Sequence, residues 1–287
     1  MSLRSRIAVL ATLLLTLNGC VNLDDAAGLS KLSDQVRNTL PKVSNDVAGT
    51  CARQNTLLTD TPANERPPNA QPQDCKPYQE ISDRLAKDES VLADYLDALG
   101  KLASNKPLSY DAAIDANVTA TSGNSALSAD TISAGNDAQK VLKALADAAT
   151  KGYREKQLGQ LIQQTDPAIQ SLTKSLKRVI TVDYALLLSN EETSLDSFYK
   201  GPMAAQSNER LTLILVQRQY ANDKAALQSR KDAMADYGKV MDDLAALHTK
   251  LNQQSGQKIN VTELAKQAAP IAESLRSALS DIQSRSN

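Results

Sequence analysis

Apolar residues recur at helical spacing over most of this chain, which is the pattern of amphipathic α-helices. Near the beginning, Leu29, Val36 and Val43 lie seven positions apart. No segment shows a convincing alternation of apolar and polar residues, as a half-buried strand would. The pattern predicts a first helix over about residues 23–57, with a kink or a break at Pro41.

A proline-rich segment follows this first helix. Residues 59–77 contain five of the ten prolines of the chain, so we expect an extended loop rather than a helix. The next apolar stripe predicts a second helix and consists of Ile81, Leu85, Leu92, Tyr95, Leu99 and Leu102.

The middle of the chain alternates between a polar segment and further helical patterns. Residues 105–127 are small and polar, and they are expected to form a linker. Helical patterns resume near Ser128 and run to Gln164, with interruptions predicted near Gly135 and Gly152.

Local signals then predict the limits of one more helix. Asp166 followed by Pro167 is typical of a helix start, with a capping carboxylate and a proline in the first turn. The helix is expected to reach about Tyr199 and to end at Gly201 and Pro202.

The longest predicted helix spans about residues 204–254. Its apolar positions form a seam of two heptad series that is typical of a coiled coil and predicts a rod of about 70 Å. The polar members of this seam are Asp223, Arg230 and His248, and its apolar members are Leu213, Val216, Tyr220, Leu227, Met234, Tyr237, Met241, Leu244 and Leu251.

A final helix is predicted after Gly256. Asn260 and Glu263 occupy the two ends of a sequence that resembles a capping box, which favours a helix start at this point. Pro270 is expected to kink that helix.

Aromatic residues are scarce, and this limits the kind of core that the chain can form. The sequence has no Trp, one Phe and eight Tyr, so the core must consist mainly of Leu, Ala, Val and Ile. Thin, Ala-rich layers suit closely packed helices. The fold class that we expect is an all-α, elongated, antiparallel helical bundle, formed as a single domain by residues 20–287.

The first twenty residues have the organisation of a secretory signal. Arg4 and Arg6 precede an apolar run, Ile7 to Leu17, that is too short to span a bilayer as a helix. The sequence Leu-Asn-Gly-Cys that ends at Cys20 resembles the bacterial lipobox, although Asn18 is a less usual residue at its position. The resemblance implies cleavage of residues 1–19 as a signal peptide, acylation of Cys20 and attachment of the mature protein to a membrane.

The charge balance restricts the class of partner. Residues 1–19 contain two arginines and no acidic residue, so the remaining chain has 30 basic and 33 acidic residues. A protein without a basic excess lacks the electrostatic footprint of nucleic-acid binding. The same balance argues against an anionic lipid surface as the main partner, so the acyl chains are expected to provide the attachment to the membrane.

Two cysteines remain once Cys20 is assigned to the lipid. Cys51 and Cys75 form an even pair in an oxidising compartment, and we predict a disulfide between them. Closing a loop of this length is worth about 3 kcal/mol in the chain-entropy model. A metal site is not expected, because His248 is the only other soft ligand and is far away in the sequence.

The sequence contains no recognisable catalytic arrangement. It has no nucleophile elbow, no Gly-rich phosphate loop and no zinc-type cluster. His248, the only histidine, occupies a position in the long seam, where a packed side chain is a far commoner role than general acid–base catalysis. We therefore expect a non-enzymatic protein without a cofactor.

Several residues are candidates for contacts with a partner. The proline loop carries Glu65, Arg66, Pro67 and Pro68, and it is either a recognition surface or a connector that the disulfide ties off. Asp223 and Arg230, one heptad apart in the long seam, either fix helix register, or mark where the helix extends past its neighbours into water, or bind another molecule.

These features predict an envelope lipoprotein that acts as a scaffold or adaptor through contacts with another envelope protein. Only Val21 and Asn22 separate Cys20 from the first helical pattern, so the bundle is expected to begin at the membrane surface. Val21 in place of Asp favours the periplasmic face of the outer membrane, by the sorting pattern of enteric bacteria. The alternative function is a helical bundle that holds an apolar small ligand or a lipid.

Overall fold

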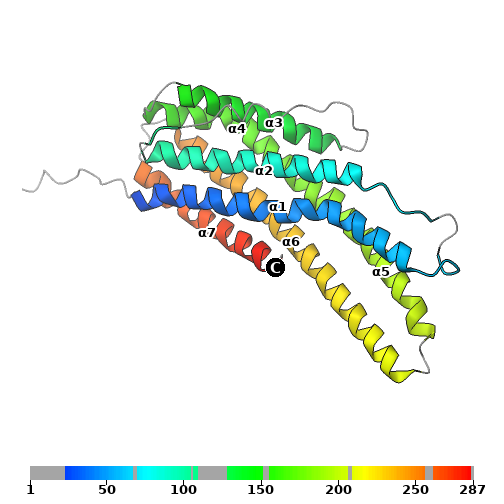
Figure 1. Ribbon diagram of the computed structural model, residues 1–287. Helices are drawn as coiled ribbons and strands as arrows, with labels where there is room; N and C mark the ends of the chain where they lie inside the picture. The colour runs from blue at the N-terminus through cyan, green and yellow to red at the C-terminus, as the bar shows by residue number, and fades with distance from the viewer. Residues whose placement is uncertain are drawn as a thin grey trace, which may run out of the picture.

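The computed structural model describes residues 23–66, 70–104, 106–108, 128–150, 155–205, 209–255 and 261–285, and every regular element within these ranges is a helix. The prediction of an all-α helical bundle is therefore confirmed (Figure 1). The elements are α1 (Leu23–Asp60), α2 (Lys76–Ala103), α3 (Ala129–Thr150), α4 (Glu155–Arg178), the π-helix η2 (Val179–Tyr184), α5 (Ala185–Ala205), α6 (Arg210–Ser255) and α7 (Val261–Arg285).

Neighbouring helices in the sequence pack against each other. The main contacts join α1 with α2, α3 with α4, and α6 with α7, while α4 lies along α6. α4, η2 and α5 follow one another without a break and form a single continuous rod. This arrangement places the core between α1, α2, α4 and α6.

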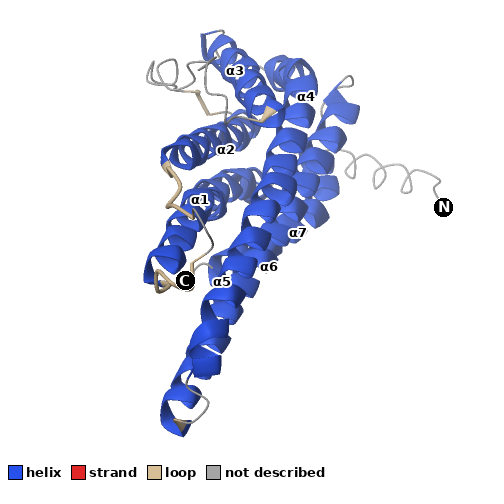
Figure 2. Cartoon of the chain, turned by 90° about the vertical axis from the view of Figure 1, so that its right-hand side faces the viewer, coloured by secondary structure: helices blue, strands red, loops and turns tan. Residues whose placement is uncertain are grey.

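Two helix ends project beyond the rest of the bundle. Figures 1 and 2 show the C-terminal part of α5 and the N-terminal part of α6 extending together, away from the other helices. We call residues 192–205 of α5 and residues 210–224 of α6, with Glu209 directly before them, the arm. None of residues 210–226 of α6 is buried, and the buried positions of this helix begin at Leu227.

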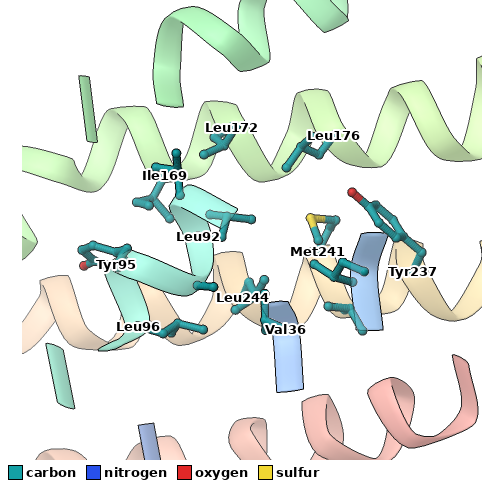
Figure 3. Packing of buried hydrophobic residues seen from close by; sticks show 14 of the residues in the cluster. Val36, Leu92, Tyr95, Leu96, Ile169, Leu172, Leu176, Tyr237, Met241 and Leu244 are labelled. Carbon is teal, nitrogen blue, oxygen red and sulfur yellow. The ribbon is translucent and has the colours of Figure 1, made fainter. Parts of the chain in front are cut away.

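The core consists of small and medium-sized apolar side chains in thin layers. Fully buried alanines, among them Ala93, Ala98, Ala134 and Ala138, let the helices approach closely. Figure 3 shows part of this core, in which side chains of four helices meet: Val36 of α1, Leu92, Tyr95 and Leu96 of α2, Ile169, Leu172 and Leu176 of α4, and Tyr237, Met241 and Leu244 of α6.

The prediction of a helix start at Asp166 and Pro167 is wrong, because both residues lie inside α4. An interior proline removes one backbone hydrogen bond and costs about 3 kcal/mol. The buried side chains of Ile162 and Ile169 lie on either side of it and each contribute about 1.5–3 kcal/mol by burial. Packing on both sides of Pro167 thus outweighs the local signal for a helix start.

The predicted helix end at Gly201 and Pro202 is also wrong, since α5 continues through both residues to Ala205. The break considered at Pro41 and the interruption predicted near Gly135 do not occur either, because α1 and α3 are continuous there. Pro270 likewise lies inside α7. In each case the helix extends past a residue of low helix propensity, which tertiary packing commonly overrides.

The proline-rich segment connects α1 to α2. Residues 61–66 and 70–75 lie outside the helices, so the predicted loop is shorter by two residues at each end than expected. The sulfur atoms of Cys51 and Cys75 lie 1.98 Å apart and their Cα atoms 5.7 Å apart, which is disulfide geometry. The predicted pairing of the two cysteines is confirmed, and it joins the last residue of the loop, Cys75, to the C-terminal part of α1.

Some of the predicted features lie outside the described residues. These are the signal segment 1–19, Cys20, Pro67 and Pro68 of the proline loop, the linker at 105 and 109–127, the interruption near Gly152, and Gly256 and Asn260 before the last helix. Within the described ranges, no helix combines the length and the apolar character that a membrane span requires.

Candidate functional site

Five side chains from four elements meet where the arm leaves the bundle, and we call them the base cluster. Arg53 of α1 donates from Nη1 and Nη2 to the carboxylate of Asp46, over 2.7 Å in both cases. Nε of Arg53 donates to Glu191 of α5 over 2.7 Å, and Arg230 of α6 donates to the same oxygen over 2.6 Å. Tyr184, the last residue of η2, donates its hydroxyl hydrogen to Asp46.

The base cluster carries two positive and two negative charges in a partly buried setting. The side chain of Glu191 is 5 % exposed and that of Arg230 is 22 % exposed. Burial opposes the charge on Arg53, but hydrogen bonds to Asp46 and Glu191 outweigh it and raise the pKa of this guanidinium above its ordinary value. Burial, followed by the neighbouring charge of Asp46, raises the pKa of Tyr184, so this phenol stays neutral and remains a donor.

The π-helix is the element that brings Tyr184 to the base cluster. A π segment adds residues to one turn and so rotates the side chains that follow it, and such segments are frequent at functional sites. Within η2, Val179, Ile180 and Tyr184 are buried, whereas Val182 is 54 % exposed. The segment therefore keeps apolar residues in the core while it directs one tyrosine hydroxyl toward α1.

An open cleft of about 510 Å³ adjoins the base cluster. This volume falls in the range of small-molecule sites. Direct contacts between α1 and α6 are sparse, and the residues of α6 that face the cleft are mostly small. Its lining residues are Lys42, Val43 and Asp46 of α1, Tyr184 of η2, and Ala226, Ser229, Arg230 and Ala233 of α6.

A second polar group lies inside the core. The carboxylate of Glu89 in α2 accepts hydrogen bonds from the hydroxyls of Tyr237 in α6, over 2.7 Å, and Ser44 in α1, over 3.0 Å. Burial raises the pKa of Glu89 to about 8, although both hydrogen bonds act in the opposite direction. Burial likewise raises the pKa of the adjacent Asp88 to about 7. The side chains of Asp88 and Glu89 are both buried, so we assign this group to the packing of the core.

His248 is buried between three helices. Its Nδ1 lies 2.8 Å from the hydroxyl of Tyr95, and its Nε2 lies 3.1 Å from Asp166 without the alignment of a hydrogen bond. Burial lowers the pKa of His248 to about 4, against the attraction of Asp166. The ring is therefore neutral near pH 7, and its Nδ1 shares a hydrogen bond with the hydroxyl of Tyr95. Its position inside the core is that of a packed histidine.

The described part of the proline loop lies against the arm. Arg66 donates to the backbone carbonyls of Thr59 and Thr61, both over 2.6 Å, and so holds the turn after α1 in place. The carboxylate of Glu65 lies over Gly201 of α5, where a Cβ atom would come within 2.3 Å of it. Of the four candidate contact residues in this loop, Arg66 thus binds the loop itself and Glu65 adjoins the arm.

Polar and aromatic contacts join the two helices of the arm. Tyr199 donates its hydroxyl hydrogen to Asp223 over 2.5 Å, and Tyr220 donates to Asp196 over 2.9 Å. Lys224 pairs with Asp196 and with Glu192 of α5. Asp223 and Arg230, the two polar seam positions, therefore both contact neighbouring helices of the same chain.

The tip of the arm exposes large apolar side chains. Leu211, Ile214 and Leu215 are 72 %, 49 % and 58 % exposed. They have the spacing of one helix face, on which Arg218 is the next member, and Arg210 lies beside them. An exposed apolar group of this kind, bordered by charged residues, is characteristic of a protein-binding surface.

The sequence identified some of these residues and missed others. It singled out Arg230, Asp223 and His248 as polar residues in an apolar seam. It did not identify Asp46, Arg53, Tyr184 and Glu191, because each is one polar residue among many on an amphipathic helix. The exposed apolar residues of the arm were missed as well, although the run from Leu211 to Val216 is apolar except for Thr212.

Comparison of the chain with protein-family models, with curated proteins and with solved structures found no match. Among the described residues there is no group of His, Cys, Asp and Glu side chains that could hold a metal ion. The candidate sites are therefore the cleft beside the base cluster and the apolar tip of the arm.

Proposed function

We propose that this protein is a non-enzymatic, lipid-anchored adaptor of the bacterial envelope. In this proposal residues 1–19 are removed, Cys20 is acylated, and the helical bundle is held at the periplasmic face of the outer membrane. The arm then binds a protein partner at a distance from the anchor. The observation that carries the proposal is the exposed apolar tip at Leu211, Ile214 and Leu215.

The geometry of α6 supports a role at a distance. This helix has 46 residues, which corresponds to about 70 Å at 1.5 Å per residue. The arm lies at the end of the bundle opposite the start of α1 (Figure 1). A lipid at Cys20, close to the start of α1, would thus leave the arm tip pointing away from the membrane.

The chemistry of the tip indicates the kind of partner. Three exposed apolar side chains on one helix face match the anchor spacing of helix-to-helix recognition. Arg210 and Arg218 are exposed beside them, so an acidic rim on the partner would complement the surface. We therefore expect an acidic amphipathic helix, or a groove with an acidic rim, on another envelope protein.

One interior cavity bears on the alternative of an apolar or lipid ligand held between the helices. The apolar cavity lined by Leu92, Tyr95 and Ile169, among others, has a volume of only about 10 Å³. That space is of the order of one water molecule. The proposal therefore rests on the outer surface of the bundle.

Photocrosslinking in cells tests the partner surface. A photoreactive amino acid at Leu215 is expected to give a discrete crosslinked species in the envelope, identifiable by mass spectrometry. Ile132, an apolar residue of α3 that is 43 % exposed, is the matched control position and should give none. A third variant carries the photoreactive amino acid at Glu65. Crosslinks from this position but not from Leu215 would indicate that the proline loop makes the contact. The absence of crosslinks from both positions would refute the adaptor role.

The anchor is tested separately. Cys20→Ser is expected to abolish acyl labelling and to shift the protein from the membrane fraction to the soluble fraction. Continued membrane association of this variant would refute lipid anchoring, whatever the outcome of the crosslinking.

A further inference from the structure

One side of α6 forms a continuous stripe that runs from the tip of the arm into the cleft. We call it the outer stripe, and its members are Leu211, Leu215, Arg218, Asn222, Ala226 and Ser229. Successive members are three or four positions apart, which keeps them on one side of a helix. The first five are exposed, and the last two line the cleft between α1, η2 and α6. The apolar tip and the cleft are therefore two ends of one surface.

The outer stripe faces away from α5. Tyr220, Asp223 and Lys224 form hydrogen bonds or ion pairs with side chains of α5, and their spacing places them on the opposite side of α6. A further helix could thus pack along the stripe without displacing α5.

In the bundle, α7 occupies the place beside α6 that is open in the arm. It packs against both α1 and α6, whose direct contacts with each other are sparse, so it lies between them. In a hairpin of two consecutive helices, residues equally far from the connection lie level with each other. Arg285, 24 residues after Val261, is therefore level with about residue 231 of α6, 24 residues before Ser255.

The cleft begins where α7 ends. It borders residues 226–233 of α6, and no described residue of α7 lines it. Figure 1 shows α7 ending partway along α6, which continues past it into the arm. The outer stripe thus continues the line along which α7 packs, and α7 itself shows that a helix fits between α1 and α6.

The charged groups at the cleft have partners within the chain. Asp46 accepts hydrogen bonds from Arg53 and Tyr184, and Arg230 donates to Glu191. The cleft therefore offers space rather than an ion-pairing site, and the small side chains of α6 leave a volume of about 510 Å³. Bulky side chains of a docked helix would fill this volume and gain contacts with its walls.

The charges on the outer stripe favour a partner of a different sequence. Arg218 lies near the middle of the stripe and is exposed, and Arg210 is exposed beside its tip. None of the six members is acidic, so two copies of the stripe would bring like charges together without a carboxylate between them. An acidic residue on another protein would complement Arg218.

The end of α7 favours one direction for a docked helix. The C-terminal end of a helix carries a partial negative charge, and that of α7 lies at the cleft. A helix in line with α7 is therefore favoured when its positive N-terminal end lies in the cleft. Its C-terminal end then lies beside Arg210, and a cation near a helix C-terminus is stabilising. Both ends favour a helix that runs antiparallel to α6.

We propose that the outer stripe binds an amphipathic helix of another envelope protein lengthwise, as a continuation of α7. The inference rests on the proposed adaptor role and adds the shape, direction and chemistry of the partner. Leu211 and Ser229 are about 27 Å apart at 1.5 Å per residue, so the docked helix has about 18 residues. Its N-terminal part carries bulky side chains for the cleft, its middle carries an acidic residue for Arg218, and its C-terminal part packs on Leu211 and Leu215.

Photocrosslinking in cells at two positions tests this arrangement. The photoreactive amino acid p-benzoylphenylalanine is placed at Leu215 or at Ala226, and both variants are expected to capture the same protein. The two positions are 11 residues apart, so mass spectrometry should find attachment sites about 11 residues apart in one amphipathic segment of the partner. The site reached from Ala226 should be the N-terminal one. Gln217 and Gln228 are exposed, lie off the stripe and should give no crosslink.

Two substitutions alter the stripe while the photoreactive amino acid stays at Leu215. Arg218→Glu reverses the central charge and Ala226→Trp obstructs the cleft, and each is expected to lower the crosslink yield about tenfold. Gln217→Glu and Gln228→Trp make the same changes off the stripe and should leave the yield unchanged. All four positions are exposed, so the variants should keep the wild-type circular dichroism spectrum.

The outcomes separate this inference from the adaptor role. A crosslink from Leu215 without one from Ala226, or attachment sites in the reverse order, would leave the adaptor role standing and refute docking along α6. Crosslinks to a second copy of this chain, or equal losses in the stripe and control variants, would refute the inference as well. The absence of a crosslink from Leu215 would remove the arm as the contact surface, and the inference with it.

Discussion

The substitution Glu89→Gln tests how the bundle accommodates a buried carboxyl group. Glu89 is fully buried and accepts hydrogen bonds from Tyr237 and Ser44. A glutamine preserves its shape and both contacts, because its carbonyl oxygen can accept from Tyr237 and its amide nitrogen can donate to the hydroxyl oxygen of Ser44. The substitution therefore removes the ability to ionise and leaves the packing intact.

The expected effect follows from the shift in the pKa of Glu89. Burial raises this pKa from 4.5 to about 8, so between these values the folded state keeps a proton that the unfolded state has released. The free energy of unfolding then falls as the pH rises, by about 1.4 kcal/mol per pH unit. From pH 4.5 to pH 7 this loss amounts to about 3 kcal/mol, and it is absent from the glutamine variant.

Urea denaturation at pH 5, 6, 7 and 8, with the disulfide intact, measures this difference. The free energy of unfolding of the variant minus that of the wild type should be smallest at pH 5 and should increase toward pH 8. Asp88 is present in both proteins, so its own titration cancels to first order. Glu80→Gln, on the exposed face of the same helix, is the matched control. A difference that is independent of pH, or that decreases as the pH rises, would refute the reasoning.

Three further predictions concern other contacts. Burial lowers the pKa of His248 from 6.5 to about 4, so the unfolded state takes up the proton first as the pH falls, and the wild type should lose up to about 3 kcal/mol between pH 6.5 and pH 4. Urea denaturation should therefore show that His248→Gln costs more at pH 7 than at pH 4.5, and equal costs would contradict this. Replacing both Cys51 and Cys75 by serine should lower the free energy of unfolding by about 3 kcal/mol, measured by the same method, and an unchanged midpoint would contradict the chain-entropy account. Glu191→Gln should cost about 2–3 kcal/mol, because it leaves two guanidinium groups without this carboxylate, whereas Glu192→Gln on the surface should cost less than about 1 kcal/mol; similar costs for the two would contradict the role of the base cluster.

Much of the fold follows from the spacing of apolar residues. The stripe in α2 that contains Leu85, Leu92 and Leu99 is buried as its spacing predicts, and α1 and α6 occupy nearly the expected ranges. The disulfide was predictable as well, since assigning Cys20 to a lipid, as the lipobox resemblance implies, leaves a single pair of cysteines. Such features depend on residue types and spacing along one segment, and a sequence displays both directly. The coiled-coil geometry expected for the long seam remains a prediction.

The errors arise where local signals and packing conflict. Taken alone, Pro167 is a strong signal for a helix start and Pro202 is a strong signal for a helix end. Each nevertheless lies inside a continuous helix. The penalty for an interior proline is fixed, whereas the gain from apolar burial on both sides depends on neighbours that are remote in the sequence. The local sequence alone therefore does not show whether the gain from burial exceeds the proline penalty. The π-helix at Val179–Tyr184 has no local signal of this kind.

The candidate sites were hidden for a related reason. Arg53 and Glu191 are separated by 138 positions in the sequence, and neither is unusual for a residue on an amphipathic helix. Only the crossing of α1 with the rod of α4, η2 and α5 brings them together. The partners of Arg230 therefore could not be named from its seam position, even though that position drew attention to it.

The long helix α6 shows most clearly where sequence pattern and burial diverge. Its heptad series continues from Leu213 to Leu251, but buried positions begin only at Leu227. The same spacing therefore occurs both in the partly exposed arm and in the buried core. In the arm, Leu213 and Val216 need to face only α5, a single neighbour. Leu211, Ile214 and Leu215 are 72 %, 49 % and 58 % exposed, and the apolar surface that they leave in water contributes no free energy of burial to the fold. Burial of these three side chains against another molecule would recover this free energy, and this is the reason why we propose the arm as the surface that contacts a partner.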